Sequence, residues 1–147
     1  MRRSRPPQRI NNEESGSAVV EFVFLGLLLL VPVVYFVLTL SQLQAGSFAV
    51  VGAADQAAKV YVSKESVPDA AAGAQRAALL VLNDFGFDAA AAEVQIRCSG
   101  ECLAPGSGVT VEVRLGVQLP LMPSGAGVSG SAISVDASAT QLVERYR

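Results

Sequence analysis

Hydrophobic and polar positions divide the chain into three segments of different character. Residues 1–16 are polar and arginine-rich, with the proline-bearing run "RPPQ", a composition that buries too little apolar surface to fold by itself. Residues 17–40 are almost entirely apolar, and Glu21 is the only charged side chain among them. From residue 41 onward apolar and polar residues are mixed. The pattern predicts a disordered leader over 1–16, one apolar helix over 17–40 and a folded domain over 41–147.

The apolar segment is long enough to cross a membrane. Its roughly 24 residues make a helix of about 36 Å, and the hydrocarbon core of a bilayer is about 30 Å thick. Four arginines precede it and few cations follow it closely, so we expect a cytoplasmic N-terminus and a C-terminal part outside. A cleaved signal peptide is the alternative. It fits less well, because the apolar run is long and the best cleavage candidate, "LQA" at 43–45, carries a bulky residue.

The helical pattern continues beyond the apolar segment and then repeats. In "SQLQAGSFAVVGAADQAAKVYV" there is no proline, and apolar residues recur every three to five positions, namely Leu43, Phe48, Val51, Ala54, Ala58 and Val62. The same helix is therefore expected to run on into the domain. Ser66 to Asp69 has the form of a capping box with proline in the first turn. A second helix is predicted to follow it and to end at Asn83 or Gly86. The residues that it is expected to turn toward a core are Ala71, Ala74, Ala78 and Leu82 or Val81.

From residue 92 the period changes to two. The runs "EVQIRC", "VTVEVRLGVQL" and "SAISVDASATQLVERY" alternate apolar with polar or small residues, and "APGSG" and "MPSGAGVSG" separate them. Such runs predict strands joined by loops. Consecutive strands favour a small antiparallel sheet with one face covered by the helices. The predicted fold class is α+β, with a long N-terminal transmembrane helix that continues into an extracytoplasmic domain.

Two cysteines, Cys98 and Cys102, lie in the part expected outside the cytoplasm. An oxidising exterior favours a disulfide between them. A metal site lacks ligands, because the chain has no histidine and one C-x-x-x-C motif cannot fill four positions.

The sequence offers little for catalysis. The missing histidine removes the usual base for a serine or cysteine nucleophile, and neither a phosphate-binding loop nor a dinucleotide-binding glycine motif is present. We expect no enzymatic activity, no cofactor and no metal. The net charge of -2 also argues against a nucleic-acid partner. The function classes that remain are assembly with other proteins and binding.

The stretch "GSAVVEF" resembles the processing site of type IV pilin-like proteins. In that family a prepilin peptidase cuts after a glycine and leaves a glutamate at the fifth mature position. Gly16 matches the residue before the cut, Ser17 the new N-terminus and Glu21 the fifth residue. Phe22 lies where aromatic residues are common in the tight-adherence (Flp) branch. The resemblance implies cleavage between Gly16 and Ser17, and subunit assembly through Glu21 and Phe22.

The resemblance extends along the N-terminal half of the chain. "SGSAVVEFVFLGLLLLVPVVYFVLTLSQLQ" followed by "AADQAAKVYV" is similar to the TadE-like minor pilins of the tight-adherence system, and "VTVEV" and "ISVDASATQLVE" are compatible with their usual ending. One departure is that "AADQAAKV" lacks the arginine and glycine of the family's "AAREGAR" run.

This resemblance implies a minor pilin or pseudopilin in the bacterial cytoplasmic membrane and, once assembled, in an extracellular Flp-type pilus. The implied partners are the prepilin peptidase, the major Flp pilin, other minor pilins, the inner-membrane assembly platform and membrane lipid. The alternative is a single-pass anchored extracytoplasmic binding domain that is never processed. A secreted enzyme has little support.

Overall fold

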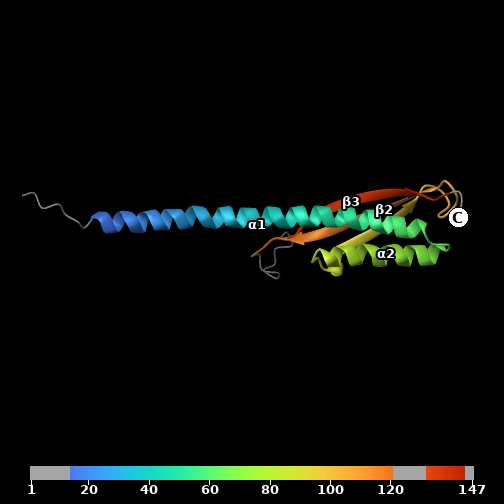
Figure 1. Ribbon diagram of the computed structural model, residues 1–147, viewed down its shortest axis with the longest axis horizontal. Coiled ribbons are helices and arrows are strands. Elements are labelled where there is room, and N and C mark those ends of the chain that lie inside the picture. Colours follow the sequence, from blue (N-terminus) through green and yellow to red (C-terminus); the bar gives the residue numbers. More distant parts are fainter. Residues whose placement is uncertain (1–13, 121–131, 145–147) are drawn as a thin grey trace, which may run out of the picture. The chain divides into compact units, whose positions relative to one another are not determined.

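The computed structural model describes residues 14–120 and 132–144 of the 147-residue chain (Figure 1). Its elements are, in order, the helices α1 (Glu14–Val62) and α2 (Val67–Asp84), a short 3-10 helix η1 (Ala89–Ala91), and the strands β1 (Ala92–Cys98), β2 (Gly108–Gln118) and β3 (Ala132–Leu142). The predicted α+β class, with a long apolar N-terminal helix, is therefore confirmed. The chain divides into two compact units, residues 1–37 and 38–147.

The first unit contains the apolar part of α1. Every side chain described from Gly16 to Val34 is exposed, including the leucines at 27–30, whose exposed fractions are 55–60%. Among the described residues α1 is the one helix long and apolar enough to cross a membrane, and none of its most apolar window is buried. The helix begins at Glu14, three residues before the expected start.

The second unit is a layer of two helices over a three-stranded antiparallel sheet in the order β1-β2-β3 (Figure 1). In the pairing register Val94 of β1 lies opposite Val113 of β2, and Val113 lies opposite Ala137 of β3. One face of the sheet is therefore apolar in all three strands. The inward-facing residues of β2 are at most 1% exposed: Val109, Val111, Val113, Leu115 and Val117.

Alanine dominates the helical side of the core. The buried residues of α1 include Ala49, Ala53, Ala54, Ala57 and Ala58, and those of α2 include Ala70, Ala74 and Ala78. Tyr61 and Leu82 are the largest buried side chains on the helices. Small side chains let helix and sheet backbones approach closely, which explains why the helices can cover a narrow sheet.

The apolar stripe that the sequence predicts along α1 coincides only in part with the residues that are buried. Phe48 and Val51 are 70% and 58% exposed, whereas Ala54 and Ala58 are fully buried. The helix turns mainly alanines toward the core, together with Val50 and Tyr61, and leaves Phe48 and Val51 outside. On α2, Ala74, Ala78 and Leu82 are buried as predicted, while Ala71 is only half-buried.

The ends of α2 follow local chemistry. Ser66 is the N-cap, with an extended backbone, and its Oγ accepts a hydrogen bond from the Asp69 amide at 3.3 Å. The same hydroxyl donates to Asp69 Oδ2 at 2.7 Å, so the carboxylate does not return to the cap's backbone amide as in a full capping box. At the other end Gly86 has a φ of 82°, the left-handed conformation that commonly follows a helix.

Candidate functional site

The four residues of the pilin-like motif lie in the first three turns of α1, in the first unit. The bond between Gly16 and Ser17 is inside the helix. A Cβ atom added at Gly16 would have no atom within 4 Å apart from its chain neighbours and the adjacent helix backbone. Packing within the described chain therefore gives no reason for a glycine at this position, and a requirement for one would have to come from a molecule outside the chain.

Glu21 and Phe22 are both exposed. Phe22 is 76% exposed, and within the described part of the chain Glu21 has no hydrogen-bond or ion-pair partner. Glu21 lies four residues, or about 6 Å along the axis, beyond Ser17, so the two occupy one helix face. A carboxylate among exposed apolar side chains such as Val20 and Phe24 has only water, lipid headgroups or another chain as a partner.

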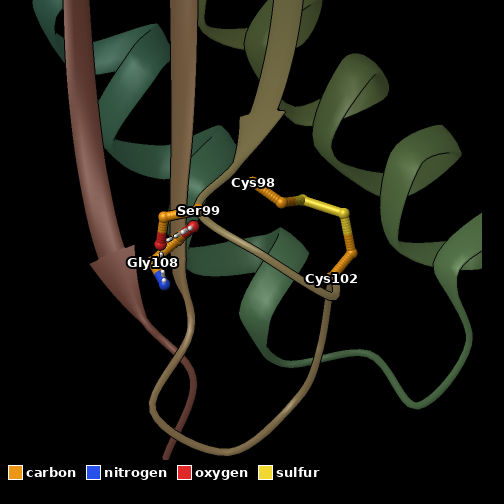
Figure 2. The surroundings of a disulfide bond; sticks show 4 residues. All are labelled: Cys98, Ser99, Cys102 and Gly108. Carbon is orange, nitrogen blue, oxygen red and sulfur yellow. Dashed lines mark hydrogen bonds between the residues drawn. A yellow bond between two sulfur atoms is a disulfide. The ribbon is translucent and has the colours of Figure 1, made fainter.

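Cys98 and Cys102 form a disulfide bond at the end of β1 (Figure 2). Their sulfur atoms are 1.96 Å apart and their Cα atoms 5.5 Å apart. Both side chains are partly buried against the hydrophobic core. As a bonded pair they offer no thiol for catalysis, and the bridge acts as a local cross-link.

The disulfide lies beside a tight junction between β1 and β2. The Ser99 amide donates to the Gly108 carbonyl at 2.8 Å, and the Gly108 amide donates to Ser99 Oγ at 2.9 Å (Figure 2). Leu103, next to the bridge, has a φ of 68° and packs against the core. Sequence reasoning missed Leu103, because a left-handed backbone is expected at glycine or asparagine rather than leucine.

Two open grooves indent the second unit. One has a volume of about 540 Å³ and is lined by Gln42, Phe85, Gly86, Phe87, Asp88, Ala91, Gly116 and Gln118. Its carboxylate, Asp88, accepts the Ala90 amide and caps η1. The other, of about 440 Å³, is lined by Val62, Ser63, Glu65, Gln141, Leu142 and Glu144. Neither gathers a nucleophile with a base, and residues 14–120 and 132–144 contain no cluster of three side chains able to hold a metal ion.

The outward face of the sheet is polar. Glu112 lies 3.1 Å from an Arg97 nitrogen and 3.6 Å from an Arg114 nitrogen, and the hydroxyls of Thr110 and Thr140 are 2.8 Å apart. Both arginine side chains are more than half exposed, so these ion pairs contribute little to stability. The indentation on this face between Glu93, Gln95, Glu112 and Arg114 has an accessible volume of about 0 Å³ and is too shallow to hold a small molecule.

Comparison of the chain with protein-family models, curated proteins and solved structures found no match.

Proposed function

We propose that this chain is a TadE-like minor pilin or pseudopilin of a Flp-type pilus. In this proposal α1 anchors it in the bacterial cytoplasmic membrane, with the N-terminus in the cytoplasm and the second unit outside. The observation that carries the proposal is the motif Gly16-Ser17…Glu21-Phe22 at the start of a helix whose apolar side chains are exposed without interruption as far as Val34. Exposed leucine, valine and phenylalanine are unfavourable in water and favourable in lipid.

Cleavage after Gly16 is the first step of the proposed function. The bond lies near the beginning of α1, where helices fray at small free-energy cost. A peptidase can therefore unwind the first turn without disturbing the rest of the helix. The open space around Gly16 supports recognition of this residue by the peptidase rather than a packing role.

Glu21 then acts in assembly. A carboxylate at the centre of a membrane helix costs about 2.5–3.5 kcal/mol on insertion scales, and less near an interface. After cleavage Glu21 is about one turn from the new N-terminus. The free amine of Ser17 in a neighbouring subunit is a suitable partner, since an unpaired charge of either sign is penalised in an apolar surrounding. Pairing would fix the stagger between adjacent helices.

The second unit provides a binding surface outside the membrane. It lacks a catalytic constellation among its described residues, and its disulfide suits an oxidising exterior. The partners in this proposal are the major pilin, other minor pilins and the membrane assembly platform, which would contact both units.

The deciding experiment is mass spectrometry of the N-terminus after expression in a host that carries the prepilin peptidase. We expect a chain that begins at Ser17, and a full-length chain in the same host without the peptidase. Gly16→Leu is the matched control, because a bulky side chain at 16 should block cleavage without affecting the fold. An intact leader in the peptidase-containing host would overturn the proposal and support the unprocessed anchored binding domain.

A further inference from the structure

The third strand, β3, leaves one edge of the sheet open. It is eleven residues long and pairs along its whole length with β2, without a bulge. It contains no proline, lysine or arginine, and its one charged residue is Asp136. Edge strands are normally protected by prolines, lysines, bulges or shortness. β3 has none of these protections.

The hydrogen bonds beside β3 identify which of its backbone groups are free. The Val143 amide donates to the Ser107 carbonyl and the Val143 carbonyl accepts from the Gly106 amide, both at 2.9 Å. Both groups of Val143 thus point toward the β2 side. In an antiparallel pair this direction alternates from residue to residue, so odd-numbered β3 residues bond to β2. The even-numbered ones present their amides and carbonyls at the open edge, and between the two ends of the strand these are Ser134, Asp136, Ser138 and Thr140.

The other side of β2 gives the same assignment independently. The Ser99 amide donates to the Gly108 carbonyl, so even-numbered β2 residues turn toward β1 and odd-numbered ones toward β3. Val109 lies opposite Gln141. Both residues are odd-numbered, so odd-numbered residues of β2 and β3 bond to each other, in agreement with the assignment from Val143. No backbone group of the described residues outside the sheet bonds to the free edge of β3, and Ser134, Asp136, Ser138 and Thr140 are all exposed.

We propose that the open edge of β3 binds an extended segment of a different polypeptide chain as a fourth strand. Main-chain hydrogen bonds to Ser134, Asp136, Ser138 and Thr140 would supply affinity, and alternating side chains would supply specificity. On the inward face the segment would lie beside Val135, Ala137 and Ala139, which are only half-buried, unlike the inward residues of β2. On the outward face Asp136, the sole charge of β3, lies opposite Arg114 of β2, which is 3.6 Å from Glu112. On its other side, at the open edge, the Asp136 carboxylate would favour a lysine or arginine of the segment.

The direction of α1 argues against a second copy of the chain as the occupant. A Cβ at Gly46 would approach Val135 near the start of β3, and Val62 lines a groove with Gln141 and Leu142 near its end. Within this unit α1 and β3 therefore run in the same direction. Antiparallel pairing of two β3 strands about a two-fold axis would reverse one α1 relative to the other. Two copies anchored in one membrane, as in the proposed function, have α1 in the same direction.

The other edge of the sheet, strand β1, is also a poor match for β3, so pairing of β3 with β1 of a second copy is unfavourable. β1 has seven residues against eleven in β3. The Cys98–Cys102 bridge also branches from the end of β1, on the side away from Gly108 (Figure 2). A segment from another chain, free of both constraints, fits the full length of β3.

Residue-resolved amide hydrogen exchange on the full chain in detergent micelles tests this proposal. The probe is a short peptide that alternates valine with threonine and has lysine at its centre. We expect the probe to slow exchange of the Ser134, Asp136, Ser138 and Thr140 amides about tenfold or more, with no change at odd-numbered β3 residues. These four amides should exchange rapidly without the peptide.

Matched variants separate edge binding from other effects. Ser138→Pro removes an outward amide that β2 does not use, and should weaken peptide binding about tenfold, whereas Ser138→Ala retains that amide and should bind normally. Should Ser138→Pro fail to fold, Asp136→Lys serves instead, and it should reverse the preference between lysine- and glutamate-centred peptides. The proposal is overturned if peptide at millimolar concentration protects no even-numbered amide, if those amides are already protected without peptide, or if their protection grows with protein concentration alone.

Discussion

A Cβ atom placed on Gly46 of α1 would lie 2.6 Å from Cγ2 of Val117 on β2. Real Cβ atoms do not approach another atom so closely, so α1 can lie on the sheet here only because residue 46 has no side chain. Val117 is itself 1% exposed and has little freedom to move. The contact therefore sets the separation between helix and sheet at the start of the second unit.

Gly46→Ala should destabilise the second unit. Overpacking typically costs about 1–3 kcal/mol, and the higher helix propensity of alanine recovers at most about 1 kcal/mol, so we expect a net loss of about 1–2 kcal/mol in the free energy of unfolding. Denaturant titration of the full chain in detergent measures it. Gly52→Ala is the control, because its nearest neighbour, Val81 Cγ1, would be at an ordinary 3.5 Å. Equal stability of the two variants would contradict this explanation.

Loss of the disulfide should cost about 2 kcal/mol in unfolding free energy, the chain-entropy value for a loop of about five residues. The double variant Cys98→Ser/Cys102→Ser and the reduced native chain should show the same loss in denaturant titration. Alkylation of the folded protein without reductant should leave both cysteines unmodified. Labelling of both thiols in protein isolated without reductant would contradict the bridge.

Ser66→Ala should shorten or loosen the start of α2. The substitution removes the acceptor of the Asp69 amide, and the loss of an N-cap typically costs about 1 kcal/mol. Ser66→Asp retains an acceptor and should recover most of the stability, although its carboxylate faces that of Asp69. Thermal unfolding of the three proteins compares them, and an unchanged midpoint for Ser66→Ala would show that the cap contributes nothing.

Glu21→Ala should leave membrane insertion intact and impair pilus assembly, because it removes the proposed partner of a neighbouring Ser17 amine. Membrane fractionation measures insertion, and the yield of sheared pili measures assembly. Glu21→Gln tests whether the charge is needed. Normal assembly by Glu21→Ala would exclude the pairing role even if cleavage after Gly16 were established.

The C-terminus is expected outside the cytoplasm, because arginines precede the apolar helix and few cations closely follow it. A reporter that is active only in the cytoplasm, fused after Arg147, should be inactive. The same reporter fused at the N-terminus provides the positive control. Activity of the C-terminal fusion would reverse the proposed orientation.

Sequence patterns predicted those parts of the fold that depend on neighbouring residues. The Ser66 cap, the period-two alternation of β2 and the spacing of Cys98 and Cys102 are local features, and each is readable from a few positions. The exposure of Phe48 was not predictable in this way, because it depends on which face of α1 meets the sheet. Leu103 was equally inaccessible, since tertiary packing rather than residue type holds its left-handed backbone.

The candidate site shows a similar division. Gly16, Ser17, Glu21 and Phe22 were identified by the resemblance of "GSAVVEF" to a pilin-like processing site. The fold of one chain tests none of their roles, because these residues contact little within it. The open edge of β3, in contrast, could not be recognised from its composition. Assigning its free amides required the direction of the hydrogen bonds at Val143 and Ser99.

The alanines between the helices and the sheet place an upper limit on side-chain size in the second unit. Alanine loses almost no rotamer entropy on burial, so the unit orders its core at low entropic cost but also removes little apolar area per residue. At these buried alanines we expect glycine and serine to be the mildest substitutions, because every larger side chain would overpack the core. On the helix side, the second unit is therefore held together by close approach of the helix and sheet backbones more than by large side chains.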